Sequence, residues 1–222
     1  MDLNKVYNED CLLGIIKIPD GSIDLVITDP PYGDNVGYGR NNKEILNNES
    51  VDINYKIIPE LYRVLKDNTC CYLFTNYVFL NDILNFIKKD TNFKYRQLIT
   101  MVKNNFGMGY GFRNQTEFCI VLEKGKPTYN LNNFSNYYKI KHINHTIDTH
   151  PHIKDYILIQ KMIKHSSKEG DIVLDPFLGS GTTAISCKQL KRSYIGFELD
   201  TKYYALIQKK LNQSSLFTYA TL

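Results

Sequence analysis

The stretch Asp171-Ile-Val-Leu-Asp175-Pro-Phe-Leu-Gly-Ser-Gly-Thr-Thr183 decides the fold. Its first five residues include a short apolar run, which predicts a buried strand ending at Asp175. The prolines and glycines that follow predict a turn, and residues 184–190 are predicted to be a helix. Strand, glycine turn and helix form the unit with which α/β proteins bind nucleotides, because glycines let the backbone approach a ligand closely. The sequence therefore predicts an α/β fold.

The glycine turn also restricts the kind of ligand. Gly179 and Gly181 lack the third glycine of a dinucleotide site, and no lysine follows them as a P-loop requires. The next predicted strand, residues 193–198, ends in Glu198, close to the separation at which an acid binds a ribose in such folds. This pattern favours an adenosine-like ligand without a phosphate, and S-adenosylmethionine fits that description.

A second stretch, Asp29-Pro30-Pro31-Tyr32, follows a predicted buried strand over residues 23–28. The two prolines fix two φ angles and stiffen the backbone after Asp29. A carboxylate, a rigid carbonyl and an aromatic ring then stand together at the carboxyl end of a strand, where open α/β sheets bind ligands. These groups suit a planar ring with an amino group. The ring would stack on Tyr32, and the amine would donate to Asp29 and to the Pro30 carbonyl. The alternative is a proline-rich turn with a capping aspartate.

Taken together, the two stretches resemble the amino-methyltransferases of DNA. Their order, with the tetrapeptide first and the glycine turn last, resembles the β class of that family. Three further segments extend the resemblance over nearly the whole chain. Residues 7–11 resemble the family's N-terminal segment, residues 103–121 resemble its antiparallel hairpin, and residues 150–154 resemble its His-Pro-x-x-Lys-Pro segment. Asp155 stands where the family usually has the last proline.

The resemblance implies a Rossmann-like methyltransferase fold. This fold has a mostly parallel twisted sheet, an antiparallel edge hairpin and helices on both faces. It also implies an S-adenosylmethionine-dependent DNA methyltransferase that modifies the exocyclic N6 amine of a flipped-out adenine. The implied catalytic residues are Asp29, Pro30, Pro31 and Tyr32. The implied cofactor-binding residues are Asp10, Cys11, Asp29, Lys154, Asp175, Phe177, Gly179, Ser180, Gly181, Thr182 and Glu198.

Several alternatives stay open at this point. Asp10 could instead cap a turn over residues 12–16, and Lys154 could be a surface lysine at the start of a helix. Aspartate at the first tetrapeptide position favours adenine in the family, whereas members that methylate the cytosine amine more often have serine there. Cytosine N4, RNA as the acceptor, and a non-catalytic subunit that binds cofactor or nucleic acid are the competing functions.

The charge distribution points to a nucleic-acid face in the middle of the chain. Residues 88–154 hold 11 Lys and Arg against 4 Asp and Glu, whereas the remainder holds 16 against 19. A basic segment on an otherwise acidic protein is typical of nucleic-acid binding, although solvated surface lysines give the same count. The candidate DNA contacts are Arg40, Lys103, Asn104, Asn105 and Arg113, and residues 126–149 are the candidate target-recognition segment.

Length predicts one domain over residues 1–222, which the resemblance implies is a methyltransferase domain, and the cysteines predict a cytoplasmic protein. The five cysteines lack metal-ligand spacing and are predicted to be reduced thiols, and no metal is expected from the histidines at positions 142, 145, 150 and 152. Neither a signal peptide nor a transmembrane helix is recognisable. A homodimer and a cognate restriction enzyme of a restriction-modification pair are the partners that the resemblance allows besides DNA.

The remaining elements follow from apolar periodicity. Strands are predicted over residues 5–8, 69–75, 93–103 and 116–123, and helices over residues 53–65, 78–88, 156–165 and 201–211.

Overall fold

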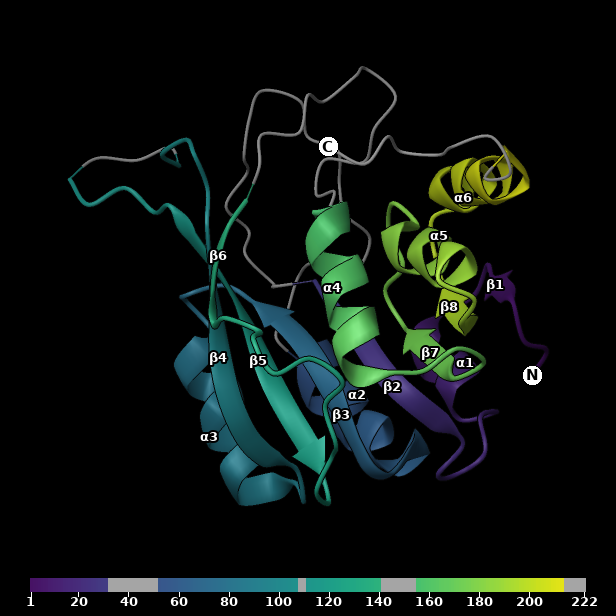
Figure 1. Ribbon diagram of the computed structural model, residues 1–222, viewed down its shortest axis with the longest axis horizontal. Coiled ribbons are helices and arrows are strands. Elements are labelled where there is room, and N and C mark those ends of the chain that lie inside the picture. The colour runs from purple at the N-terminus through teal and green to yellow at the C-terminus, as the bar shows by residue number, and fades with distance from the viewer. Residues whose placement is uncertain (32–51, 108–110, 141–154, 214–222) are drawn as a thin grey trace.

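The computed structural model describes residues 1–31, 52–107, 111–140 and 155–213 (Figure 1). In these ranges eight strands form one sheet in the order β1-β8-β7-β2-β3-β5-β4-β6. The strands are β1 Lys5–Tyr7, β2 Ile23–Thr28, β3 Leu65–Thr75, β4 Lys94–Val102, β5 Thr116–Lys124, β6 Tyr137–Lys139, β7 Ile172–Asp175 and β8 Ser193–Phe197. Neighbours pair in parallel except where β5 lies antiparallel to both β3 and β4. The predicted mostly parallel sheet with an antiparallel hairpin is confirmed.

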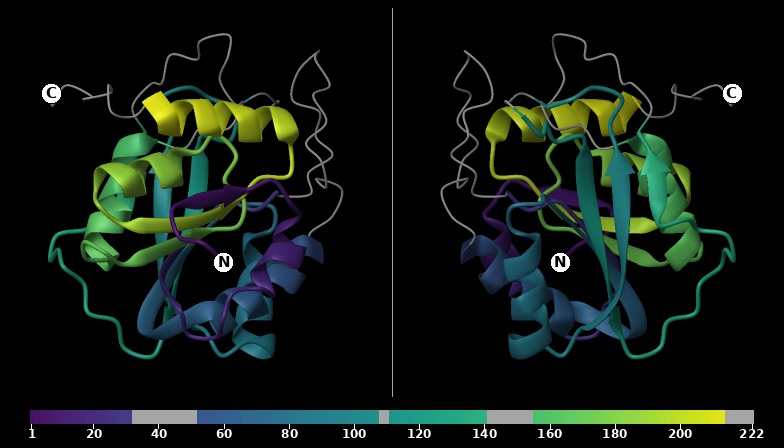
Figure 2. Two further views of the ribbon diagram at one scale, coloured as in Figure 1. Left: turned by 90° about the vertical axis from the view of Figure 1, so that its right-hand side faces the viewer. Right: turned by 90° about the vertical axis from the view of Figure 1, so that its left-hand side faces the viewer.

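Helices cover both faces of the sheet, as Figure 2 shows. They are α1 Cys11–Ile15, α2 Asp52–Val64, α3 Leu80–Asp90, α4 Tyr156–Ser166, α5 Thr182–Gln189 and α6 Thr201–Gln213. Apolar residues of α1, α2 and α3 belong to one buried cluster, and those of α4, α5 and α6 belong to the other. Adjacent residues of a strand point to opposite faces, so Cys70 of β3 lies in the second cluster and Cys71 in the first.

The central strand β2 is apolar because both of its faces are covered. Leu25, Val26 and Ile27 are all buried, and they alternate between the two clusters. The sequence of a strand that is buried on both faces is a continuous apolar run rather than an alternation of apolar and polar residues. This explains why the sequence defines β2 so clearly.

The order of the strands changes direction between β2 and β7. The chain proceeds from β2 to β3 on one side, whereas β7, β8 and β1 lie on the other side. Such a change of direction opens a crevice at the carboxyl ends of the two central strands. Helix α1 packs tightly against β8, since a Cβ atom on Gly14 would lie only 2.1 Å from a ring carbon of Phe197.

Strand β6 is an element that periodicity did not predict. It lies in the segment 126–149 and pairs with β4, where Thr100 is opposite Tyr137 and Val102 is opposite Lys139. Residues 141–149 of that segment lie outside the described part of the chain. Among the described residues, no helix is both long and apolar enough to cross a membrane.

Candidate active site

Four acidic residues line the carboxyl edge of four adjacent strands. Asp10 follows β1, Glu198 follows β8, Asp175 ends β7 and Asp29 follows β2. The strands are neighbours in that order, and Asp175 is in register with Gly196 of β8. Since neighbouring strands lie about 4.8 Å apart, the four acids are spread over an edge of about 14 Å.

Asp175 is the most buried of these acids, with 5% of its surface exposed. Burial, together with the negative charges of Asp29 and Glu198, raises the pKa of its carboxyl to about 7. Hydrogen bonds from the Thr183 hydroxyl and the Phe177 N–H act in the opposite direction. A carboxyl with these neighbours is partly protonated at neutral pH, so the site favours a ligand that carries positive charge.

Glu198 connects the glycine turn to the end of β8. Its Oε2 accepts from the Gly179 N–H at 2.8 Å, and its Oε1 accepts from the Asp200 N–H at 2.8 Å. Burial raises its pKa. Each carboxylate oxygen can accept more than one hydrogen bond, so these backbone contacts leave capacity for the hydroxyls of a ribose.

The glycine turn needs its glycines for two different reasons. Gly179 and Gly181 have φ angles of 53° and 84°, in the left-handed region that other residues rarely adopt. A Cβ atom on Gly181 would also lie 3.1 Å from Ile207 of α6. The hydroxyls of Ser180 and Thr182 are hydrogen-bonded at 2.9 Å, and Thr182 begins α5. The turn therefore follows a backbone path, packed against α6, that residues with a side chain rarely adopt.

Asp10 is the N-cap of α1, because its Oδ1 accepts from the Leu12 N–H at 2.7 Å. The capping role that the sequence left open is thus confirmed, and the contact with the cofactor adenine stays a prediction. Burial, together with the charge of Asp10, raises the pKa of the neighbouring Cys11 thiol to about 12. Cys11 is accordingly a neutral thiol at physiological pH.

The described part of the tetrapeptide comprises Asp29, Pro30 and Pro31, while Tyr32 lies outside the described residues. The amide nitrogen of Asn54, which is 1% exposed in α2, donates to the Pro31 carbonyl at 3.4 Å. The sequence analysis missed Asn54. The available signal was a polar residue on the face of α2 that buries Ile57, Ile58 and Leu61.

The candidate DNA contacts on the hairpin have partners within the protein. Lys103 forms an ion pair with Glu117, and the Arg113 Nε donates to the Gly107 carbonyl at 2.8 Å. Asn104 and Asn105 are exposed. Their contacts with DNA stay predictions.

Arg40, Lys154 and the four histidines at 142, 145, 150 and 152 lie outside the described residues. Asp155, which replaces the family proline, caps α4 by accepting from the Ile157 N–H at 2.9 Å. Within the described ranges, no group of three or more metal-ligating side chains occurs.

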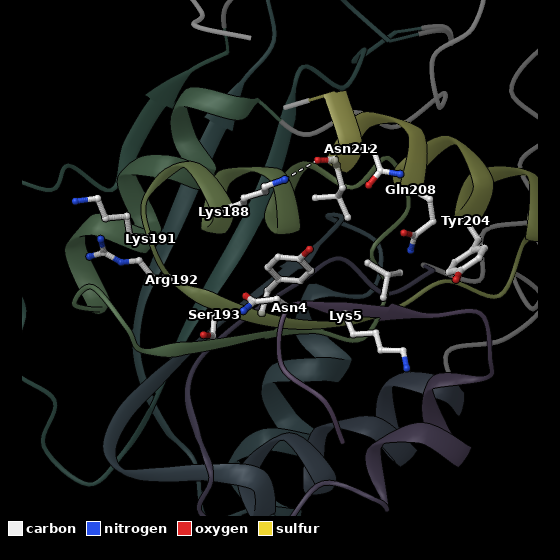
Figure 3. Close-up of a pocket in the computed structure, with 12 residues that line it drawn as sticks. Asn4, Lys5, Lys188, Lys191, Arg192, Ser193, Tyr204, Gln208 and Asn212 are labelled. Atoms are coloured by element: carbon white, nitrogen blue, oxygen red, sulfur yellow. Dashed lines mark hydrogen bonds between the residues drawn. The ribbon is translucent and has the colours of Figure 1, made fainter. Parts of the chain in front are cut away.

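A separate cavity of about 660 Å³ lies between α5, α6 and the β1–β8 edge (Figure 3). None of the predicted site residues lines it. Its basic residues have acceptors in the protein: Lys188 donates to the Leu211 carbonyl, Arg192 donates to the Ser167 carbonyl, and Lys191 pairs with Glu169. The cavity is therefore a weaker candidate for ligand binding than the acidic edge.

The strand order and the glycine turn at the carboxyl edge define a Rossmann-like methyltransferase fold. The crystal structure of the M1.HpyAVI–SAM complex has the same fold, with a TM-score of 0.73 and 27% sequence identity over 94% of this chain and 98% of that one. The family model for N6/N4 DNA methylases matches residues 23–209, and the chain belongs to this family.

Curated relatives agree with this assignment. The type II methyltransferase M.HpaI of Haemophilus parainfluenzae is 31% identical over 220 residues, which cover 88% of this chain and 70% of M.HpaI. The DNA adenine methyltransferase YhdJ of Escherichia coli (strain K12) is 27% identical over 254 residues, which cover 96% of this chain and 84% of YhdJ.

Proposed function

We propose that this DNA methylase transfers a methyl group from S-adenosylmethionine to the N6 amine of adenine in a flipped-out base. The observation that carries the proposal is the order of the acids along the sheet edge. Asp10, Glu198, Asp175 and Asp29 follow one another on neighbouring strands. This order matches that of the adenine, ribose and methionine parts of S-adenosylmethionine, followed by the amine of the target base.

The edge suits S-adenosylmethionine in both shape and charge. Glu198 has acceptor capacity for the ribose hydroxyls, and the backbone of Gly179 and Gly181 leaves room for the ligand. The carboxyls of Asp175 and Asp29 give the edge a negative potential next to the position of the sulfonium. Phe177, Ser180 and Thr182 of the turn complete the proposed cofactor contacts, with Cys11 and Lys154 from flanking segments.

The acceptor must be prepared, because the lone pair of an exocyclic amine is delocalised into its ring. Asp29 and the Pro30 carbonyl would accept the two amine protons and turn the lone pair out of the ring plane. S-adenosylmethionine supplies a methyl group that is activated by its bond to a sulfonium. As the amine nitrogen binds the methyl carbon, the carbon–sulfur bond breaks and its electron pair stays on sulfur. The surplus amine proton leaves through Asp29 to solvent. Positioning and electrostatics supply the rate enhancement.

This direct displacement requires no covalent enzyme intermediate. All five cysteines are free and buried, and burial raises the pKa of the Cys11 thiol, which follows Asp10 in the chain, to about 12. A neutral buried thiol is a poor nucleophile. A base inside a duplex cannot present its amine in this way, so the target base must leave the stack, which costs a few kcal/mol.

Adenine is proposed because the first tetrapeptide residue is aspartate and because the relative YhdJ is a DNA adenine methyltransferase. The family model covers both N6 and N4 enzymes, so cytosine N4 is the competing acceptor. Residues 126–149 are proposed to contribute to target recognition, since their described part includes β6 beside the β4–β5 hairpin. A homodimer and a cognate restriction enzyme stay predictions.

The test is transfer of labelled methyl groups to unmethylated DNA, followed by nucleoside analysis. We expect N6-methyladenine with the wild type and at least a 100-fold lower rate with Asp29→Asn, the scale of losing one positioned proton acceptor. Binding of S-adenosylmethionine should be weaker but still measurable in that variant, because Glu198 and the glycine turn are unchanged. Asp67→Asn is the matched control, because that carboxylate is 82% exposed at the opposite end of the sheet.

Each of the other possible outcomes would refute one part of the proposal. Label in N4-methylcytosine would replace the acceptor base and keep the site. Label in RNA alone, or in no nucleic acid despite cofactor binding, would refute DNA as the substrate of the isolated chain. Equal rates for Asp29→Asn and Asp67→Asn would refute the role of Asp29.

A further inference from the structure

The tip of the β4–β5 hairpin exposes two aromatic rings beside an arginine. Phe112 is 108% exposed and Phe106 is 62% exposed, which are high values for side chains of this size. The Arg113 guanidinium lies 5.5 Å from the centre of the Phe106 ring, and its Nε–H donates to the Gly107 carbonyl. We call Phe106, Phe112 and Arg113 the aromatic tip. Two rings held in water on one projecting turn are a feature of binding surfaces rather than of a stable core.

Strand register places the aromatic tip above the proposed catalytic edge. Thr28, the last residue of β2, is in register with Leu73 of β3, which pairs through Ile120 of β5 with Leu98 of β4. Strand β4 continues for four residues beyond that level, to Val102. At about 3.3 Å per residue, the hairpin rises about 13 Å past the end of β2 before its tip begins.

The hairpin therefore extends past the end of β2, to one side of Asp29. Three strand spacings, about 14 Å, separate β2 from β4 along the sheet. The tip projects away from the body of the sheet (Figure 1). The length by which the hairpin extends past the end of β2 exceeds the depth of the DNA major groove, about 8.5 Å. The tip can therefore reach the base stack of a duplex that is bound over Asp29.

The charge around the tip is complementary to DNA. Residues 94–139 contain seven Lys and Arg and two Glu, and one of those glutamates, Glu117, is paired with Lys103. Lys139 on β6 lies beside Val102 at the base of the tip. Basic side chains around exposed aromatic rings are the combination with which proteins hold the backbone and stack on the bases of nucleic acids.

We propose that the aromatic tip inserts into the DNA base stack next to the target base, with Phe112 filling the space that the base leaves when it enters the active site. This inference rests on the proposed function. Arg113 and Phe106 hold the shape of the tip, while Phe112 makes the stacking contact. The partner is duplex DNA at the position of the flipped base.

The test compares two duplexes that carry a target site mapped with the wild-type enzyme. In one duplex the target base is paired, and in the other it faces an abasic position and is already unpaired. We expect Phe112→Ala to lower the rate of methyl transfer on the paired duplex by about 5- to 100-fold, the scale of losing one stacked ring. On the unpaired duplex the loss should fall below about threefold, because that base leaves the stack more easily.

Matched variants separate this role from general binding. Phe112→Trp should retain the wild-type rate, since it keeps a flat ring. Tyr95→Ala removes an aromatic ring that is 50% exposed at the other end of the same hairpin, and it should have no effect. Fluorescence of 2-aminopurine at the target position should show less flipped base with Phe112→Ala. The KM for S-adenosylmethionine should stay unchanged.

The outcomes distinguish the inference from the function on which it rests. A wild type that methylates no DNA would overturn the proposed function. An active wild type together with a fully active Phe112→Ala would overturn only this inference. Equal losses on both duplexes, or a change of oligomeric state in sedimentation caused by Phe112→Ala, would overturn it too, in favour of general binding or self-association. Thermal unfolding monitored by circular dichroism confirms that each variant is folded.

Discussion

Replacing Asp175 with asparagine should stabilise the cofactor-free protein in a pH-dependent way. The carboxyl is buried at the acidic edge, and burial raises its pKa from 3.8 to about 7. Between these pH values the unfolded chain releases a proton that the folded chain retains. The folded state therefore loses stability as the pH rises through this range.

The size of the effect follows from the two pKa values. At 1.36 kcal/mol per pH unit, the difference between about 7 and 3.8 corresponds to about 4 kcal/mol at pH 8, and to about half of that near pH 5.5. Asparagine keeps an oxygen that can accept from the Phe177 N–H, as Asp175 Oδ1 does at 3.1 Å. It removes the ionisation, so the variant should gain up to about 4 kcal/mol of unfolding free energy at pH 8.

The assay is urea unfolding without cofactor at pH 5.5 and pH 8. Asp175→Asn should exceed the wild type by a larger margin at pH 8 than at pH 5.5, whereas Asp67→Asn, which changes an exposed carboxylate, should show the same small difference at both. The same variant should bind S-adenosylmethionine more weakly, since it removes negative charge from the edge. An equal margin at the two pH values would show that the Asp175 carboxyl ionises as it does in water, and would refute the reasoning.

Two further substitutions test the packing around the site. Gly14→Ala places a methyl group 2.1 Å from the Phe197 ring and should destabilise the protein by roughly 1–3 kcal/mol in thermal unfolding, with partial recovery when Phe197→Leu is added; an unchanged melting temperature would contradict this packing. Asn54→Leu removes the hydrogen bond to the Pro31 carbonyl and should lower kcat by roughly 2- to 10-fold, with the melting temperature and the cofactor KM nearly unchanged. A loss of stability without a loss of kcat would make Asn54 a purely structural residue.

The central strands β2 and β7 could be predicted from the sequence because they are buried on both faces. The predicted strand 23–28 agrees with β2, and the predicted strand 171–175 differs from β7 only at its first residue. Strand β6 was missed, since its three residues alternate between exposed and half-buried and depend on pairing with β4, far away in the chain. Local periodicity carries no information about such a pairing.

The candidate site also combines features that the local sequence predicts with features that depend on residues far apart in the chain. The sequence placed each of the four acids at the end of a strand, but the order of these strands in the sheet follows from crossovers that no local pattern encodes. The contact between Asn54 and Pro31 likewise joins residues 23 positions apart. The departure at Asp155 has a local explanation in the structure, because its side chain caps α4 in place of the family proline.

The pairing of β1 with β8 has a consequence for how the protein is made. Strand β1 finds its partner only after β8 has been synthesised, and the Asn8 amide then donates to the Glu198 carbonyl, 190 residues away. Contacts with such large sequence separation form late, because closing a long loop is entropically unfavourable. The part of the edge that contains Asp10 and Glu198 is therefore among the last regions of the nascent chain to assemble. A ribosome-bound fragment that lacks β8 leaves β1 without its partner strand, so this edge of the sheet forms only after β8 has left the ribosome.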